Sequence, residues 1–369
     1  MLNLLYDLLY EPDGAFSFLR LFNYITSRAM FAALTGLAIS ILAGQRSILA
    51  LFKAGFTDRV RDYGVLDISG KRGTPTMGGV MIVVATAVAA FLWCDLSNPF
   101  VLISAAALVW FSALGLVDDL QKHRFGDAEK GLRRWPKFLL QTAFGIGLGL
   151  ILYMPATSPL PPELRSTLQL PFVKAPIVDL GWTSVLVTAL IVAFAANAVN
   201  FADGLDGLAV VPAFFVAAVY GVFGYVLGNQ VYSTYLQFVK IPGAGELAIF
   251  CAGLVGASVG FLWFNAYPAE VFMGDAGSLP LGGVLGTLAA LLRQEVLFLL
   301  AGGVFVAEMA SVVLQDWVGL KLLKRRIIYR APLHHTFQYM GMAETKIAVR
   351  FWIVSGLLMV ISLISLKVR

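Results

Sequence analysis

Ten apolar segments divide this chain, and each approaches the roughly 20 residues that a helix needs to cross a bilayer. They run over 22–44, 77–94, 100–118, 138–154, 183–201, 208–228, 247–264, 278–292, 296–320 and 351–366. The pattern predicts an all-α, polytopic integral membrane protein with about ten transmembrane helices, forming a single domain over residues 1–369. The ninth segment contains Gly302, Gly303 and Glu308, and we expect its helix to bend or to leave the membrane obliquely.

Composition supports the membrane interpretation. The chain has 59% hydrophobic and 13% charged residues, and its mean hydropathy is +0.81. A soluble protein of this length could not bury so much apolar surface, so a bilayer must cover much of it. Cys94 and Cys251 both fall in or at the end of apolar segments. We interpret them as small packing residues, which excludes a disulfide or thiolate metal site.

The distribution of Lys and Arg predicts the orientation. Segments 45–76, 119–137 and 321–350 hold six, six and seven of the chain's 27 cations, and ten alternating spans place all three on one side. The positive-inside rule puts this side in the cytoplasm and both termini on the outer side. The loops near 202–207 and 265–277 then also face the cytoplasm.

The ends of several apolar segments carry polar groups suited to catalysis. Asp118 and Asp119 close the run FVLISAAALVWFSALGLVDD, and ionisable groups at membrane depth are candidates for function. Similar clusters occur in NAVNFADGLDG (197–207), FNAYPAEVFMGDAGS (264–278) and, in a basic version, RAPLHHTF (330–337). The aspartates are hard oxygen ligands of the kind that Mg²⁺ prefers together with substrate phosphate. Lys and Arg in the same loops would spread the charge of a phosphoryl-transfer transition state, which favours an enzyme acting on a phosphorylated substrate.

Each signal has a simpler explanation when it is taken alone. The Asp118–Asp119 pair fits a helix end reaching water, and DGLDG fits a turn. Asn197 and Asn200 are one helical turn apart and fit interhelical hydrogen bonding, as does Glu308. It is the joint occurrence of these groups on one predicted face that favours a site.

Six longer motifs carry a resemblance to a known family. They are KRGTPTMGG (71–79), GLVDD (115–119), NAVNFADGLDGLA (197–209), FLWFNAYPAEVFMGDAGSL (261–279), LLRQE (291–295) and PLHHTF (332–337). Together they resemble the muramoyl branch of the polyprenyl-phosphate N-acetylhexosamine-1-phosphate transferases, over nearly the whole chain. The resemblance implies ten transmembrane helices, Mg²⁺ as cofactor, and UDP-MurNAc-pentapeptide and undecaprenyl phosphate as substrates that yield lipid I and UMP. It also implies a homodimer in the bacterial cytoplasmic membrane, with membrane lipid around it, an active site on the cytoplasmic face, and no nucleic-acid partner.

The resemblance also assigns roles to individual residues. The catalytic candidates are Asp118, Asp119, Asp275 and His334. Asp275 is the candidate metal ligand, Asp118 a candidate base or phosphate-activating group, and His334 a phosphate or sugar contact or a proton carrier. The substrate-binding candidates are Lys71, Thr76, Asn197, Asn200, Asp203, Asp206, Asn265, Phe272 and His335. Phe272 would stack on uracil, and Lys71 would meet the diphosphate.

One motif departs from the family pattern, which usually reads PxHHHFE at the position of PLHHTF. Thr336 replaces the third histidine and Gln338 the glutamate, which argues against an essential third imidazole. Two competing functions stay open: a sibling transferase that uses UDP-GlcNAc, and a cation-coupled transporter, which would place carboxylates at the bilayer midplane between repeats. Direct attack by the lipid phosphate and a two-step route through a phospho-aspartate both fit the sequence; we favour direct attack.

Overall fold

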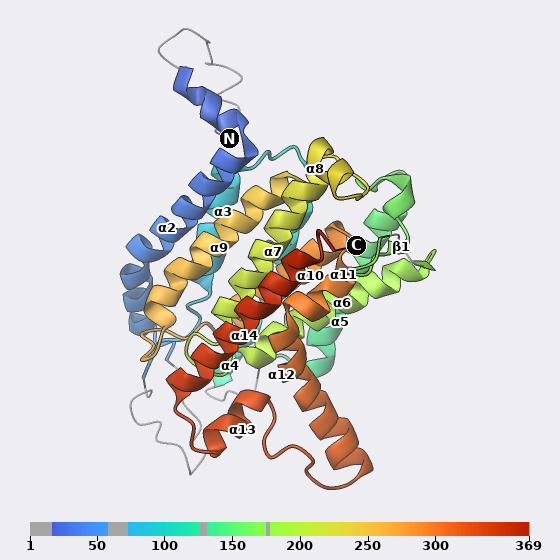
Figure 1. Ribbon diagram of the computed structural model, residues 1–369. Coiled ribbons are helices and arrows are strands. Elements are labelled where there is room, and N and C mark those ends of the chain that lie inside the picture. Colours follow the sequence, from blue (N-terminus) through green and yellow to red (C-terminus); the bar gives the residue numbers. More distant parts are fainter. Residues whose placement is uncertain (1–16, 58–72, 126–130, 175–177, 369) are drawn as a thin grey trace.

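The computed structural model describes residues 17–57, 73–125, 131–174 and 178–368, and these form a bundle of long, oblique helices (Figure 1). The elements in chain order are η1 (Ser17–Asn23), α2 (Ile25–Lys53), α3 (Val80–Trp93), α4 (Pro99–Phe125), α5 (Arg134–Tyr153), η3 (Pro162–Leu164), β1 (Thr167–Leu168), β2 (Val178–Asp179), α6 (Thr183–Ala202), α7 (Val210–Gly228), α8 (Gln230–Tyr235), α9 (Glu246–Asn265), α10 (Asp275–Leu291), α11 (Glu295–Ala301), α12 (Gly303–Val313), the π-helix η4 (Leu314–Leu322), α13 (Leu333–Tyr339) and α14 (Glu344–Ile364).

Eight helices among the described residues are long and apolar enough to cross a membrane. They are α2, α4, α5, α6, α7, α9, the α12–η4 unit and α14, and α3 and α10 are shorter apolar helices. Each falls on one of the ten predicted apolar segments. This arrangement confirms a mostly helical, multi-pass membrane protein, while a count of ten crossings and the side of the termini stay predictions.

Among the described residues there is one short two-stranded sheet. Between α5 and α6, strands β1 and β2 pair antiparallel, with Thr167 opposite Asp179 and Leu168 opposite Val178. Pro159, Pro161 and Pro162 precede this hairpin, and proline disfavours helix continuation because it lacks an amide donor and clashes with the preceding turn. The fold is mostly helical, as predicted, and this short hairpin is an addition that the sequence pattern did not predict.

Helices also extend beyond the predicted segment boundaries. The helix α4 continues past Asp119 to Phe125, and α2 continues to Lys53, so each enters a predicted cytoplasmic loop. The ninth apolar segment is broken at Gly302 into α11 and α12, and η4 continues away from the bundle (Figure 1). The expected bend is thus present at the glycine pair.

The helix α10 lies at the centre of the bundle and is packed against α4 and α6. All its residues from Ala276 to Leu291 are buried. Small residues allow this close packing, as they do at membrane helix interfaces. A Cβ placed on Gly282 would lie 2.4 Å from the carbonyl oxygen of Ala195 in α6, and one on Gly115 of α4 would lie 2.1 Å from that of Asp275. The glycines therefore set the distance at which the polar ends of these helices meet.

Candidate active site

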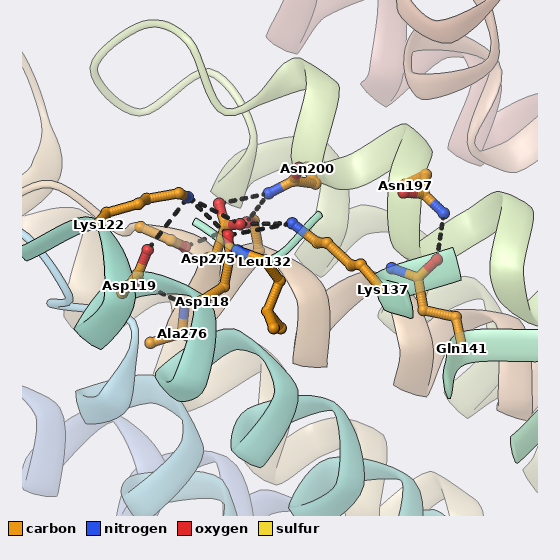
Figure 2. A network of polar contacts seen from close by, with 12 residues as sticks. Asp118, Asp119, Lys122, Leu132, Lys137, Gln141, Asn197, Asn200, Asp275 and Ala276 are labelled. Carbon is orange, nitrogen blue, oxygen red and sulfur yellow. Dashed lines mark hydrogen bonds and ion pairs between the residues drawn. The ribbon is translucent and has the colours of Figure 1, made fainter. Parts of the chain in front are cut away.

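Three aspartates meet where α4 passes the first turn of α10 (Figure 2). Asp118, Asp119 and Asp275 each offer an oxygen, and these oxygens all lie within 4.8 Å of one another. Asp119 also accepts a hydrogen bond from the Ala276 amide at 2.8 Å, so it satisfies one of the free N–H groups that begin α10. Asp118 and Asp119 are buried, and clustered buried carboxylates are costly unless cations or N–H donors face them.

Two lysines supply the compensating charge. Lys122 Nζ lies 2.7 Å from Asp118 Oδ2 and 3.0 Å from Asp275 Oδ2. Lys137 Nζ, from the first turn of α5, lies 2.6 Å from Asp275 Oδ2 and 3.3 Å from Asp118 Oδ2. Three carboxylates and two ammonium groups leave this cluster with a formal charge of −1 when all are ionised. The sequence offered both lysines only as members of a broad basic surface, and their convergence on one point appears only in the fold.

Asn200 belongs to the same cluster. Its amide nitrogen donates to Asp275 Oδ1 and to Ser278 Oγ, both at 2.8 Å. Asn197, one turn earlier on α6, instead donates to Gln141 Oε1 of α5 and to the Ala193 carbonyl (Figure 2). Both asparagines were predicted to bind substrate, but the structure engages one with the aspartates and the other in an interhelical hydrogen bond.

The loop of residues 203–207 lies beside this cluster. Burial, followed by the negative charges of Asp275 and Asp119, raises the pKa of Asp203 to about 8. The nearby carboxylates thus favour the neutral form of Asp203, which can donate a hydrogen bond, as neutral acids do in other active sites. Asp206 differs, because its Oδ2 accepts the Ala269 amide at 3.1 Å and so connects this loop to the segment before α10.

The segment before α10 is fixed by backbone pairing. Asn265 accepts the Gly207 amide and donates to the Val271 carbonyl, which holds both loops together. The Phe272 amide donates to the Pro75 carbonyl at 2.8 Å, and the Phe272 carbonyl accepts the Gly78 amide at 2.8 Å. The side chain of Phe272 is half-buried. Thr76, which follows Pro75, is half-buried, and its amide donates to the Phe56 carbonyl. Lys71 lies outside the described residues.

His334 and His335 lie in α13, and the ring of His334 lies against Gly204 of the 203–207 loop. His334 is buried, and its backbone amide and Nδ1 lie 3.1 Å from Oε1 and Oε2 of Glu308. Because a carboxylate only accepts hydrogen bonds, this pairing places the proton on Nδ1. His335 Nδ1 lies 2.8 Å from the Gln338 amide oxygen, and burial followed by the neighbouring His334 lowers its pKa.

Thr336, which stands where the family pattern has a third histidine, has a structural contact. Its hydroxyl accepts the Arg330 amide at 3.1 Å and donates to the Arg330 carbonyl, closing the turn before α13. A hydrogen bond to a neighbouring element, predicted for Glu308, is present, with His334 as its partner. Glu344 and Trp352 were not predicted; both also contact the 203–207 loop.

Comparison with known proteins identifies relatives of this chain. The sequence model for "Glycosyl transferase family 4" matches residues 100–293, and signature 1 of the phospho-N-acetylmuramoyl-pentapeptide-transferases matches residues 71–83. A protein of Desulfosudis oleivorans (strain DSM 6200 / JCM 39069 / Hxd3) named "Phospho-N-acetylmuramoyl-pentapeptide-transferase" is 42% identical over 366 residues. The alignment covers 99% of this chain and 100% of that relative.

Proposed function

This chain belongs to the phospho-N-acetylmuramoyl-pentapeptide-transferase family, and we propose that its three-aspartate cluster is the metal and phosphate site of that reaction. The enzyme transfers phospho-MurNAc-pentapeptide from UDP-MurNAc-pentapeptide to undecaprenyl phosphate. An oxygen of the lipid phosphate bonds to the sugar-linked phosphorus, and the bond from that phosphorus to the bridging oxygen breaks. Lipid I and UMP are the products.

The observation that carries this proposal is the convergence of Asp118, Asp119 and Asp275 with two lysines at one helix end. Carboxylate oxygens within 4.8 Å of one another fit a hard divalent cation such as Mg²⁺, and Asp275 contributes from the start of α10. When bound, Mg²⁺ would neutralise charge on the diphosphate and its leaving oxygen. The donor set therefore suits the proposed cofactor.

The protein's own groups would bind and align the two phosphates. Lys122 and Lys137 are within reach of Asp118 and Asp275, so both can also contact phosphate oxygens brought to the aspartates. Asp203, whose pKa is raised by burial and by the neighbouring aspartates, can donate to a substrate oxygen beside them in its neutral form. The lipid phosphate needs little base strength, so alignment dominates over proton removal. Asp118 accepts hydrogen bonds at both oxygens, which hold it in place. We favour direct attack because one metal ion and two anionic substrates can be aligned without a covalent intermediate.

The direct test is UMP release by the purified protein in detergent. UDP-MurNAc-pentapeptide and undecaprenyl phosphate would be supplied with a Mg²⁺ titration, with chelator and with UDP-GlcNAc in place of the muramoyl substrate. We expect UMP only with the muramoyl substrate, the lipid phosphate and the metal together. UMP release with UDP-GlcNAc but not with UDP-MurNAc-pentapeptide would identify a sibling transferase. No release with either nucleotide substrate would reject the proposal.

Phe272→Ala is expected to weaken binding of the UDP substrate. We propose that the half-buried ring stacks on uracil, and stacking on a base contributes about 1–3 kcal/mol. The backbone bonds of Phe272 do not need its side chain, so the segment should keep its shape. KM for the UDP substrate should rise while KM for the lipid stays constant. Phe172→Ala in the exposed connection between β1 and β2 is the matched control, and an equal KM in both variants would contradict the stacking role.

The topology gives a second test. We propose ten crossings, both termini outside, a homodimer, and an active site on the cytoplasmic face of the bacterial inner membrane. Single cysteines at the exposed positions Ala156 and Ala343 would be treated with a membrane-impermeant maleimide in intact cells. Position 156 should react and position 343 should not, and the native Cys94 and Cys251 are buried. Labelling of position 343 from outside would reverse the proposed orientation.

A further inference from the structure

Three side chains of the C-terminal segment contact Gly204, Asp206 and Gly207 of the 203–207 loop. Glu344 Oε1 accepts the Asp206 amide at 3.0 Å, and Trp352 Nε1 donates to the Gly207 carbonyl at 3.0 Å. The ring of His334 lies against Gly204, where a Cβ would be 2.3 Å from Nε2. We name Glu344, Trp352 and His334 the C-terminal clamp. Its members come from α13 and α14, far in sequence from the loop that they contact.

The clamp has a rigid base. Glu308 of α12 fixes His334 through two contacts of 3.1 Å. Leu205, Leu208 and Ile347 form a separate buried apolar cluster against which Phe337, Met342 and Phe351 pack. Apolar side chains of the loop are therefore held by the same C-terminal segment that contacts its backbone.

The loop itself needs such support. Its sequence is DGLDG, and glycine has more accessible backbone conformations than any other residue. Gly207 adopts φ +70°, a region that other residues rarely enter. Asn265 adds one further bond, to the Gly207 amide. Bonds from other elements, rather than regular secondary structure, thus hold the backbone of Asp206 and Gly207 in this loop.

The clamp lies in a part of the chain that the alignment with the relative covers and the family 4 model does not. The glycosyl transferase family 4 model ends at residue 293, so it includes the 203–207 loop but none of the clamp. We infer that Glu344 and Trp352 are positioning residues, which hold the loop in the conformation that receives the uridine-diphosphate half of the substrate. This inference rests on the proposed function, because that function supplies the ligand of the loop.

The variants for the test remove individual groups of the clamp side chains. Trp352→Phe keeps a ring but loses the N–H donor, and Glu344→Gln keeps an acceptor oxygen that Glu344→Ala loses. We expect KM for the UDP substrate to rise about tenfold in Trp352→Phe and Glu344→Ala, the factor that corresponds to about 1.4 kcal/mol. Glu344→Gln should restore KM to near the wild-type value, and KM for the lipid phosphate and kcat should stay constant. Trp182→Phe, at an exposed position before α6, is the matched control.

Hydrogen exchange of the loop amides provides a measurement that does not depend on turnover. Amides 204–207 of the wild-type protein in detergent should exchange slowly, and faster in Trp352→Phe and Glu344→Ala, with thermal unfolding temperatures close to wild type. Unchanged exchange would disprove the clamp. Faster exchange with an unchanged KM would show that the clamp holds the loop without serving the substrate. If the wild-type protein releases no UMP but the two variants still exchange faster than it does, the proposed function is rejected and the clamp is retained.

Discussion

Replacing Asp275 by asparagine is expected to remove most of the turnover while the protein stays folded. Asparagine has the same shape and keeps an oxygen that can accept from Asn200, but it loses the charge that faces Lys122 and Lys137. It also loses the hard anion proposed to hold Mg²⁺, whose charge stabilisation is worth several kcal/mol. A loss of about 4 kcal/mol in transition-state stabilisation lowers kcat roughly 1,000-fold.

The measurement is UMP release across a Mg²⁺ titration, together with a thermal unfolding curve. Asp179→Asn, at an exposed position of β2, is the control for the same chemical change away from the cluster. Activity of the Asp275 variant within about threefold of wild type, or roughly 0.65 kcal/mol on the barrier, would remove Asp275 from the metal site.

Gly115→Ala is expected to damage the site through the backbone rather than through a functional group. The added Cβ would lie 2.1 Å from the Asp275 carbonyl oxygen and 2.9 Å from the Ala276 Cα. The contacting atoms are backbone, so α4 and α10 must separate, and such overpacking costs about 1–3 kcal/mol. Separation would stretch the Asp119–Ala276 bond and move Asp118 away from Asp275. We expect a lower unfolding temperature and a fall in kcat of about a hundredfold, corresponding to roughly 2.7 kcal/mol on the barrier.

Gly147→Ala is the matched control. Gly147 also lies inside a membrane helix, but a Cβ there meets no atom within 4 Å. Because alanine is the better helix former, this variant should be at least as stable as wild type. Equal activity of the two alanine variants would show that the contact between α4 and α10 does not determine the geometry of the site.

The sequence predicted the bundle well because membrane helices have a strong one-dimensional signal. A run of apolar residues must be helical when no water satisfies its backbone, so ten such runs became ten helices or helix groups. The break after Ala301 was visible as Gly302–Gly303, whereas the π-helix that follows Val313 had no clear sequence signal. The hairpin was missed because its strands contain only two residues each.

The composition of the candidate site was less accessible to sequence reasoning. The motifs suggested that Asp118, Asp119 and Asp275 would meet, and these three do converge. Asn200 was predicted only as a substrate-binding residue, and its hydrogen bond to Asp275 appears only in the structure. This contact depends on how α6 is rotated against α10, and rotation follows from the packing of small residues in three dimensions. The contacts of Glu344 and Trp352 with the loop join residues more than 130 positions apart, so no local sequence pattern predicts them.

The burial of α10 limits how strongly membrane thickness can affect the three-aspartate cluster. The helix has 17 residues, and no lipid reaches those from Ala276 to Leu291, so its length need not match the thickness of the hydrocarbon layer. Hydrophobic mismatch acts instead on the outer helices α2 and α14, because most residues of their apolar stretches are not buried within the protein. When acyl chains lengthen or shorten, these helices can tilt while protein contacts alone fix the depth of Asp275. Asp275, at the start of α10, is thereby insulated from variation in the lipid composition of the membrane.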